Sequence, residues 1–114
     1  MLQDVHSRKI SQSVDAPVGT TVIIPFTTNE WHYIHELIGN LQSAGFLEVM
    51  AVMHSTGVQR SLGKFDLTQS QGITLQDEPG EDNRPRFEFK PGEDASLIVT
   101  GGDFVGSLHW SKRY

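Results

Sequence analysis

The chain has 114 residues, no cysteine and a formal net charge of −5, from nine Lys and Arg against fourteen Asp and Glu. This length fits a single domain. A domain of about this size buries roughly two-thirds of the surface that its unfolded chain exposes, so it can fold without disulfides or a structural metal. The absence of cysteine excludes disulfides and thiolate metal sites. The acidic surplus disfavours nucleic acid as a partner, because such binding needs cations that displace counterions from phosphates.

Neither a secretion signal nor a membrane partner is expected. The segment Met1–Ile10 is polar and lacks the apolar centre of a signal peptide. No apolar run approaches the roughly 20 residues that cross a bilayer. We therefore expect the protein to be synthesised in a cytoplasm.

Residues 1–18 differ from the rest of the chain in their weak, polar patterning. They end in the turn-forming sequence Asp15-Ala16-Pro17-Val18-Gly19. This contrast predicts an extended N-terminal arm over residues 1–18, which either lies along the domain or reaches outward, and one β-sandwich domain over residues 19–114.

From Gly19 onward, short segments rich in β-forming residues recur between turn residues such as Pro91-Gly92. Phe87 and Phe89 alternate with polar residues, as in a strand with one buried face. The pattern predicts an all-β protein, an antiparallel β-sandwich or jelly roll of about eight short strands. The expected strands are Thr20–Phe26, Gly45–His54, Leu62–Leu67, Gly72–Gln76, Arg86–Lys90, Ser96–Thr100 and Phe104–Trp110.

The segment Trp31–Leu41 fits two structures. Ile34, Leu37, Ile38 and Leu41 lie at helical spacing, yet the same segment also reads as a strand. Gly39 costs a helix about 1 kcal/mol. The residues themselves leave helix and strand open.

His32 and His35, beside Glu36, are the closest approach to a metal motif. On a helix the two histidines share a face, whereas on a strand they point to opposite faces. The helical zinc motif requires glutamate directly after the first histidine, where this chain has Tyr33. We expect no metal site and no cofactor.

The acidic segment Asp77–Asn83 lacks the alternating ligands and the sixth-position glycine of a calcium loop. A solvated acidic loop is favoured, and whether it binds a cation stays open.

Catalytic motifs are also missing from the sequence. There is no G-x-S-x-G sequence and no cysteine nucleophile, and nothing places a serine beside a base. The glycine-rich segment 101–106 matches no phosphate-binding spacing and is typical of a hairpin turn. His54 and His109 are isolated near strand ends. We expect a protein that is not an enzyme.

The segment Gly45–His54 is apolar on both faces of the expected strand. Leu47, Val49, Ala51 and Met53 share one face, and Phe46, Met50 and Val52 share the other. One face belongs to the core, so the second needs a cover, which an arm, a loop or another subunit provides. We therefore predict a homo-oligomer, a dimer or trimer. The candidate protein–protein interface residues are Trp31, Ile34, Ile38, Phe46, Met50, Val52 and Trp110.

The chain from Tyr33 to Tyr114, about two-thirds of its length, has a distinctive succession of strand and turn residues. The order comprises Tyr33–Gly39, Ser43-Ala44-Gly45, Leu62–Leu67, Gly72–Leu75, Phe87, Pro91-Gly92-Glu93, Leu97-Ile98-Val99, Val105–Leu108 and Tyr114. It resembles small β-sandwich capsid decoration, or cement, proteins of tailed bacteriophages. The resemblance implies a jelly-roll-like sandwich in which Tyr33–Leu41 is a strand. It also implies a place on the virion, with the major capsid protein and further copies of the chain as partners.

The leading expectation is thus a non-enzymatic decoration protein that binds the outer capsid surface and stabilises the shell. The alternative is a carbohydrate- or receptor-binding module of a phage tail or head fibre, with Trp31, Tyr33 and Trp110 as a sugar platform. A cupin-like enzyme is disfavoured because the histidines are scattered along the chain.

Overall fold

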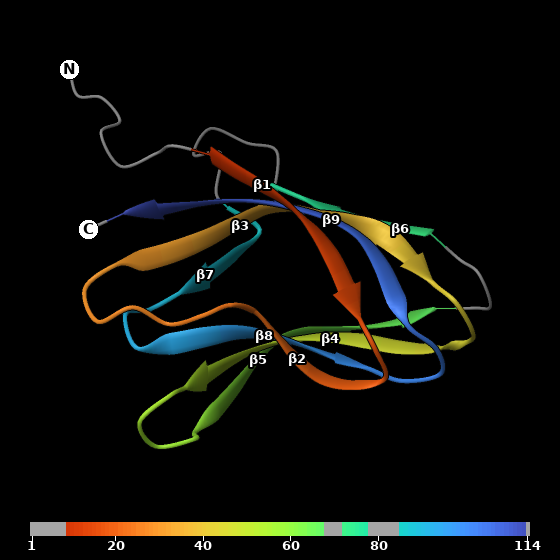
Figure 1. Ribbon diagram of the computed structural model, residues 1–114, viewed down its shortest axis with the longest axis horizontal. Coiled ribbons are helices and arrows are strands. Elements are labelled where there is room, and N and C mark those ends of the chain that lie inside the picture. The colour runs from red at the N-terminus through yellow and green to blue at the C-terminus, as the bar shows by residue number, and fades with distance from the viewer. Residues whose placement is uncertain (1–8, 68–71, 78–84, 114) are drawn as a thin grey trace.

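The computed structural model describes residues 9–67, 72–77 and 85–113 of the chain (Figure 1). In these residues there are nine strands and no helix, and therefore no helix that could cross a membrane. The strands are β1 (Lys9–Ala16), β2 (Gly19–Ile24), β3 (Trp31–Leu41), β4 (Gly45–Met53), β5 (Gln59–Leu67), β6 (Gly72–Gln76), β7 (Phe87–Phe89), β8 (Glu93–Val99) and β9 (Phe104–Arg113).

The described strands form two antiparallel sheets that pack face to face (Figure 1). One has the order β1-β9-β3-β6, with β7 also paired to β3, and the other has the order β2-β8-β4-β5. Because β6 pairs with Glu36–Asn40 and β7 with His32–Ile34, the two are halves of one interrupted strand along β3. Counted this way, each sheet holds four strands in jelly-roll order, and successive strands change sheet except for the hairpin β4–β5, which confirms the predicted fold class.

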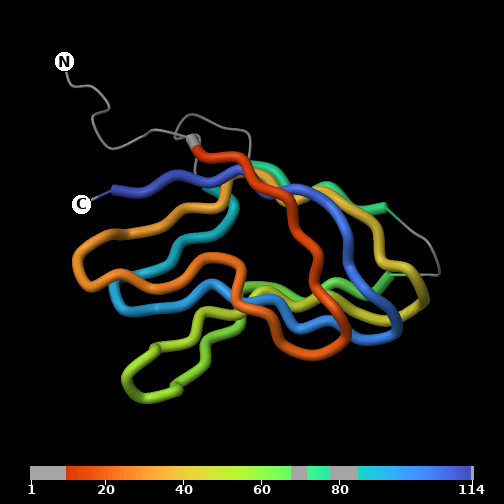
Figure 2. The backbone as a smooth tube through the Cα atoms, in the orientation of Figure 1, coloured from red at the N-terminus to blue at the C-terminus, as the bar shows by residue number. Residues whose placement is uncertain are grey.

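Strand β1 covers residues 9–16 of the predicted arm. It pairs with β9 from Lys9↔Ser111 to Ala16↔Phe104, so the two strands run side by side in Figure 2. Val14 and Ala16 are buried in the core. Residues 9–16 are therefore an edge strand of the sandwich: this part of the expected arm is extended and lies along the domain. Only two core residues alternate with polar ones in this strand, which is why its pattern looked weak; residues 1–8 of that prediction lie outside the described part.

The segment Trp31–Leu41, whose sequence fits both a helix and a strand, is the eleven-residue strand β3. Its pairing with β9 shifts register between Ile34 and Glu36, so a β-bulge sits at His35. The bulge reverses the alternation: Ile34 is buried before it, and Leu37 and Leu41 are buried after it. This reversal produces the helix-like spacing of apolar residues in a segment that is entirely strand.

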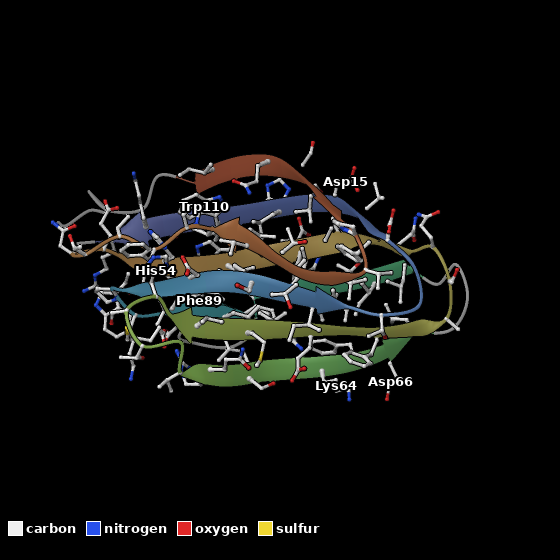
Figure 3. All side chains as sticks on the ribbon, turned by 60° about the horizontal axis from the view of Figure 1, so that its bottom comes forward. Asp15, His54, Lys64, Asp66, Phe89 and Trp110 are labelled. Carbon is white, nitrogen blue, oxygen red and sulfur yellow. The ribbon has the colours of Figure 1, made fainter. Side chains whose placement is uncertain are left out.

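The core lies between the sheets and is built from the inward residues of nearly every strand. Phe89 is enclosed there, whereas Lys64 and Asp66 lie on the outer side of β5 (Figure 3). Gly39 and Gly106 face each other on β3 and β9. A β-carbon on Gly39 would lie 2.7 Å from Cζ of Phe104, so the fully buried ring of Phe104 fits only above a glycine.

Candidate functional site

The outer face of β3 carries two neighbouring hollows. The first, which we call the aromatic hollow, has a volume of about 380 Å³ and is lined by Trp31, Tyr33, Glu88 and Arg113. Strand register brings these side chains together, because Trp31 pairs with Arg113 of β9 and Tyr33 pairs with Glu88 of β7. Directly paired residues of antiparallel strands project from the same face of a sheet.

The two rings in the aromatic hollow are nearly parallel. Their centroids are 6.5 Å apart and their planes differ by 9°. Both side chains are partly exposed. Aromatic rings with an apolar body and a polar tip suit ligands that combine flat apolar faces with hydrogen-bonding groups.

The second hollow is polar. It has a volume of about 420 Å³ and is lined by His35, Glu36, Gln76, Asp77 and His109. Glu36 accepts a hydrogen bond from Nε2 of Gln76 at 3.0 Å and lies 3.5 Å from Nε2 of His109. The second ring nitrogen of His109 is 2.8 Å from the hydroxyl oxygen of Ser11.

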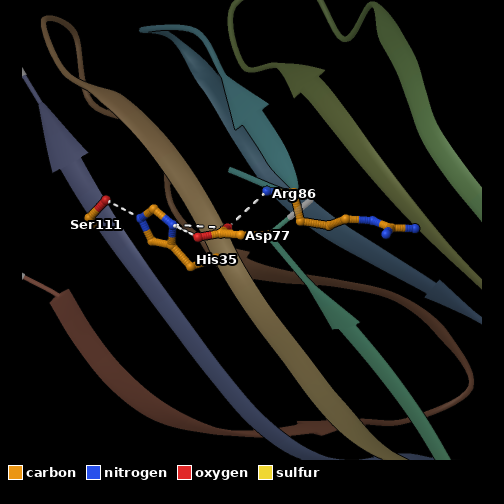
Figure 4. Close-up of polar contacts among 4 residues, drawn as sticks. All are labelled: His35, Asp77, Arg86 and Ser111. Atoms are coloured by element: carbon orange, nitrogen blue, oxygen red, sulfur yellow. Dashed lines mark hydrogen bonds and ion pairs between the residues drawn. The ribbon is translucent and has the colours of Figure 1, made fainter. Parts of the chain in front are cut away.

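His35, the bulge residue, connects three strands (Figure 4). Its Nδ1 donates to the carboxylate of Asp77 at 3.0 Å, and its Nε2 lies 2.7 Å from Oγ of Ser111. Asp77 also accepts from the backbone N–H of Arg86 at 3.2 Å, which ties the end of β6 to the approach to β7.

Ser111, His35 and Asp77 thus have the connectivity of a catalytic triad. A nucleophile must, however, meet a substrate carbon, and Ser111 is only 4% exposed. It does not line the polar hollow. The arrangement therefore fixes the bulge rather than presenting a nucleophile. No local sequence pattern links Ser111 to His35, since the two residues are 76 positions apart.

His32 and His35, which were considered as a metal motif, lie on opposite faces of the sheet. His35 faces outward, whereas His32 is buried and its ring meets the edge of Trp110 at a centroid distance of 5.2 Å. Burial lowers the pKa of His32 below its usual value, partly opposed by the negative charge of Glu30. Among the described residues no group of three or more His, Asp or Glu side chains is arranged to hold a metal ion.

The outer face of the other sheet carries an apolar group that we call the β4 face. It consists of Val22, Phe46, Met50, Val52 and Ile98. Val22 and Met50 lie in one cross-strand row on either side of Ser96. Val22 is 50% exposed, whereas Met50 is buried within the subunit. Nζ of Lys64 covers the ring of Phe46 at 4.1 Å.

At the rim of the β4 face, Asp94 holds the start of β8. It accepts from the backbone N–H of Phe26 at 2.8 Å and lies 3.0 Å from Nδ1 of His54, which stacks on Phe26. His54 is thus part of a structural contact.

The seven predicted interface residues do not form one patch. Phe46, Met50 and Val52 lie on the β4 face, while Trp31 and Ile38 lie on the outer face of β3. Ile34 is fully buried, so its assignment to an interface is wrong; the bulge at His35 turns it inward.

Trp110 also differs from expectation. It pairs with Ile34, packs against the core and donates from Nε1 to Oε1 of Gln12 at 3.0 Å. It therefore lies on the opposite side of its sheet from Trp31 and Tyr33 and cannot join them in a sugar platform. In the acidic segment Asp77–Asn83, the carboxylate of Asp77 contacts His35. Residues 78–83 lie outside the described part of the chain.

Comparison with known proteins identifies the fold alone. No family model and no curated protein sequence matches the chain. The Drosophila NLP-core, described for pentamer formation and histone binding, is 11% identical, with a TM-score of 0.52 over 91% of this chain and 98% of its own. A protein of the disulfide-linked pili of Bacillus endospores is 11% identical, with a TM-score of 0.48 over 96% of this chain and 88% of its own. PirA is 13% identical, with a TM-score of 0.39 over 98% of this chain and 97% of its own. None of the three is named as a capsid protein.

Proposed function

We propose that this protein is a non-enzymatic assembly protein that associates with copies of itself through the β4 face and decorates the outer surface of a viral capsid. The observation that carries the proposal is the β4 face, an apolar group on the outside of a sheet whose inner side already supplies the core. Val22 is half exposed there, beside the partly exposed Ile98 and Val52.

The β4 face combines apolar and polar side chains, as many protein–protein interfaces do. Its apolar side chains are interspersed with Ser96 and Glu48, which is paired with Ile98, and the charged side chains of Lys64 and Asp66 on β5 lie at its border. Contiguous exposed apolar groups with polar rims mark interaction sites on soluble domains. A second copy of the same chain is the occupant that a self-complementary apolar face suits best.

Two further considerations support the proposal. The segment Tyr33–Tyr114 resembles phage decoration proteins, and this resemblance is the reason for proposing the major capsid protein as the partner. NLP-core, which shares the fold, is described for pentamer formation, so a jelly roll of this size is compatible with a closed ring. For this chain we expect a dimer or trimer.

The self-association is tested with two matched valine substitutions. Val22→Glu places a charge on the β4 face, whereas Val105→Glu places the same charge on the outer face of the other sheet, where Val105 is 46% exposed. In sedimentation at micromolar concentration we expect an oligomer for the natural chain and for Val105→Glu, and a monomer for Val22→Glu. A monomeric natural chain, or an unchanged Val22→Glu oligomer, contradicts the proposal.

The capsid role needs its own experiment. Added to capsids stripped of decoration, the natural chain is expected to bind at saturable copy number and to raise the temperature at which particles rupture. An oligomer that leaves both quantities unchanged would retain the self-association and refute the capsid as its target.

A further inference from the structure

We infer that the aromatic hollow is a binding site for a neutral oligosaccharide. It lies on the outer face of β3, on the sheet opposite the β4 face, and is therefore separate from the surface proposed for self-association. No step of the proposed assembly uses Trp31, Tyr33, Glu88 or Arg113.

The rings select the apolar part of the ligand. Trp31 and Tyr33 are parallel to within 9°, and their centroids are 6.5 Å apart along one strand. A pyranose ring offers a face of C–H groups with slight positive charge, which packs on the negative face of an aromatic ring. Two parallel rings on one strand can contact neighbouring parts of a single sugar chain.

The polar groups select the rest of the ligand. Arg113 only donates hydrogen bonds, Glu88 only accepts them when ionised, and the Tyr33 hydroxyl does both. A sugar hydroxyl also donates and accepts, so it can use all three. An anionic ligand would meet Glu88 and a cationic ligand would meet Arg113, and the mixed charge therefore favours a neutral, hydroxyl-rich molecule.

The size and the rigidity of the aromatic hollow suit a small ligand. A volume of about 380 Å³ falls near the lower end of the roughly 300–1,000 Å³ typical of small-molecule sites. The four side chains project from three hydrogen-bonded strands in fixed register. Sites built on strands hold their groups in place before the ligand arrives, which reduces the entropy lost on binding.

The test uses the fluorescence of Trp31. The chain has two tryptophans, so Trp110→Phe leaves Trp31 as the sole reporter. This variant is titrated with tetramers of the cello-, malto-, chito- and manno-oligosaccharide series. We expect a saturable change in emission with at least one series and little dependence of the affinity on ionic strength, as befits a neutral ligand.

Substitutions then locate the site. Tyr33→Ala is expected to weaken binding about tenfold, since a ring contact and its buried area contribute on the order of 1.4 kcal/mol. Phe46→Ala removes an aromatic ring from the opposite sheet and should leave the affinity unchanged. The melting temperature of each variant shows whether it is folded.

The outcomes distinguish this inference from the proposed function. Val22→Glu should bind the tetramer as the natural chain does, even as a monomer. Saturable binding of ATP but of no sugar would show that the ligand class is wrong. No saturable change with any sugar, or equal loss in Phe46→Ala and Tyr33→Ala, overturns the inference whatever the oligomeric state.

Discussion

Gly39 lies directly against the ring of Phe104, on neighbouring strands of one sheet. A β-carbon at position 39 would be 2.7 Å from Cζ of that ring and 2.5 Å from the carbonyl oxygen of Val105. One of these two contacts is with backbone, which has little room to move. The glycine is therefore required by packing, since no larger residue leaves space for the ring.

Gly39→Ala is expected to lower the free energy of unfolding by about 1–3 kcal/mol, the usual cost of overpacking a core. Urea denaturation followed by fluorescence measures the change. Asn40→Ala, at the exposed neighbouring position, serves as the control and should stay within about 0.5 kcal/mol of the natural chain. Equal stability of Gly39→Ala and the natural chain would show that the ring of Phe104 can move aside.

The buried imidazole of His32 makes stability depend on pH. Burial lowers its pKa in the folded protein below the ordinary value of 6.5. As the pH falls through that value, the unfolded chain binds the proton more readily than the folded protein does. The free energy of unfolding should therefore fall between about pH 7.5 and about pH 5.5.

His32→Phe keeps an aromatic ring against Trp110 and removes the proton-binding group. Its stability is expected to fall less over the same pH interval, as measured by denaturation at both ends. Asn40→Ala, the exposed control used above, should keep the decrease of the natural chain. A natural chain and a His32→Phe variant with the same pH dependence would refute the role of His32.

The Ser111–His35–Asp77 connection is expected to be structural. A fluorophosphonate that labels activated serines should not modify Ser111, because this residue is only 4% exposed and the reagent cannot reach its hydroxyl. Mass spectrometry of the treated protein measures the label. Modification of Ser111 in the natural chain, and its loss in His35→Gln, would instead reveal an active nucleophile.

Strand β1 predicts the outcome of truncation. A chain lacking residues 1–18 loses Val14 and Ala16 from the core and leaves β9 without one of its two neighbours. We expect it to lose most of its folding free energy, about 5–15 kcal/mol for a typical domain. A chain lacking only residues 1–8 keeps β1 and is the comparator. Calorimetry showing the same melting temperature for both truncations would contradict an integral role for β1.

Much of the fold could be predicted because alternation and turn residues are local signals. The expected strand Gly72–Gln76 coincides with β6, and Gly45–His54 differs from β4 by one residue. The start of β8 was missed, since Glu93 and Asp94 look like turn residues. Both are buried because their carboxylates have partners, and Glu93 accepts from Arg60 at 2.8 Å and from the backbone of Lys90 at 2.7 Å.

The candidate site could be predicted only in part. Trp31 and Tyr33 stand two positions apart, so a strand places them side by side without further information. Their partners Glu88 and Arg113 depend on the register of β7 and β9 against β3. The bulge at His35 shifts the register of β9 against β3, and no local sequence pattern indicates it. Residues brought together by long-range pairing therefore escaped prediction, whereas those adjacent on one strand did not.

The pairing of β1 with β9 has a consequence for biosynthesis. It joins the first and last described strands, whose side chains Gln12 and Trp110 are hydrogen-bonded although 98 positions apart. During translation β1 has left the ribosome long before its partner strand exists. It must wait, unpaired, until β9 has been made. Contacts of such long sequence separation slow folding, so the nascent chain has an extended period in which chaperones, proteases or a neighbouring nascent chain can capture this strand.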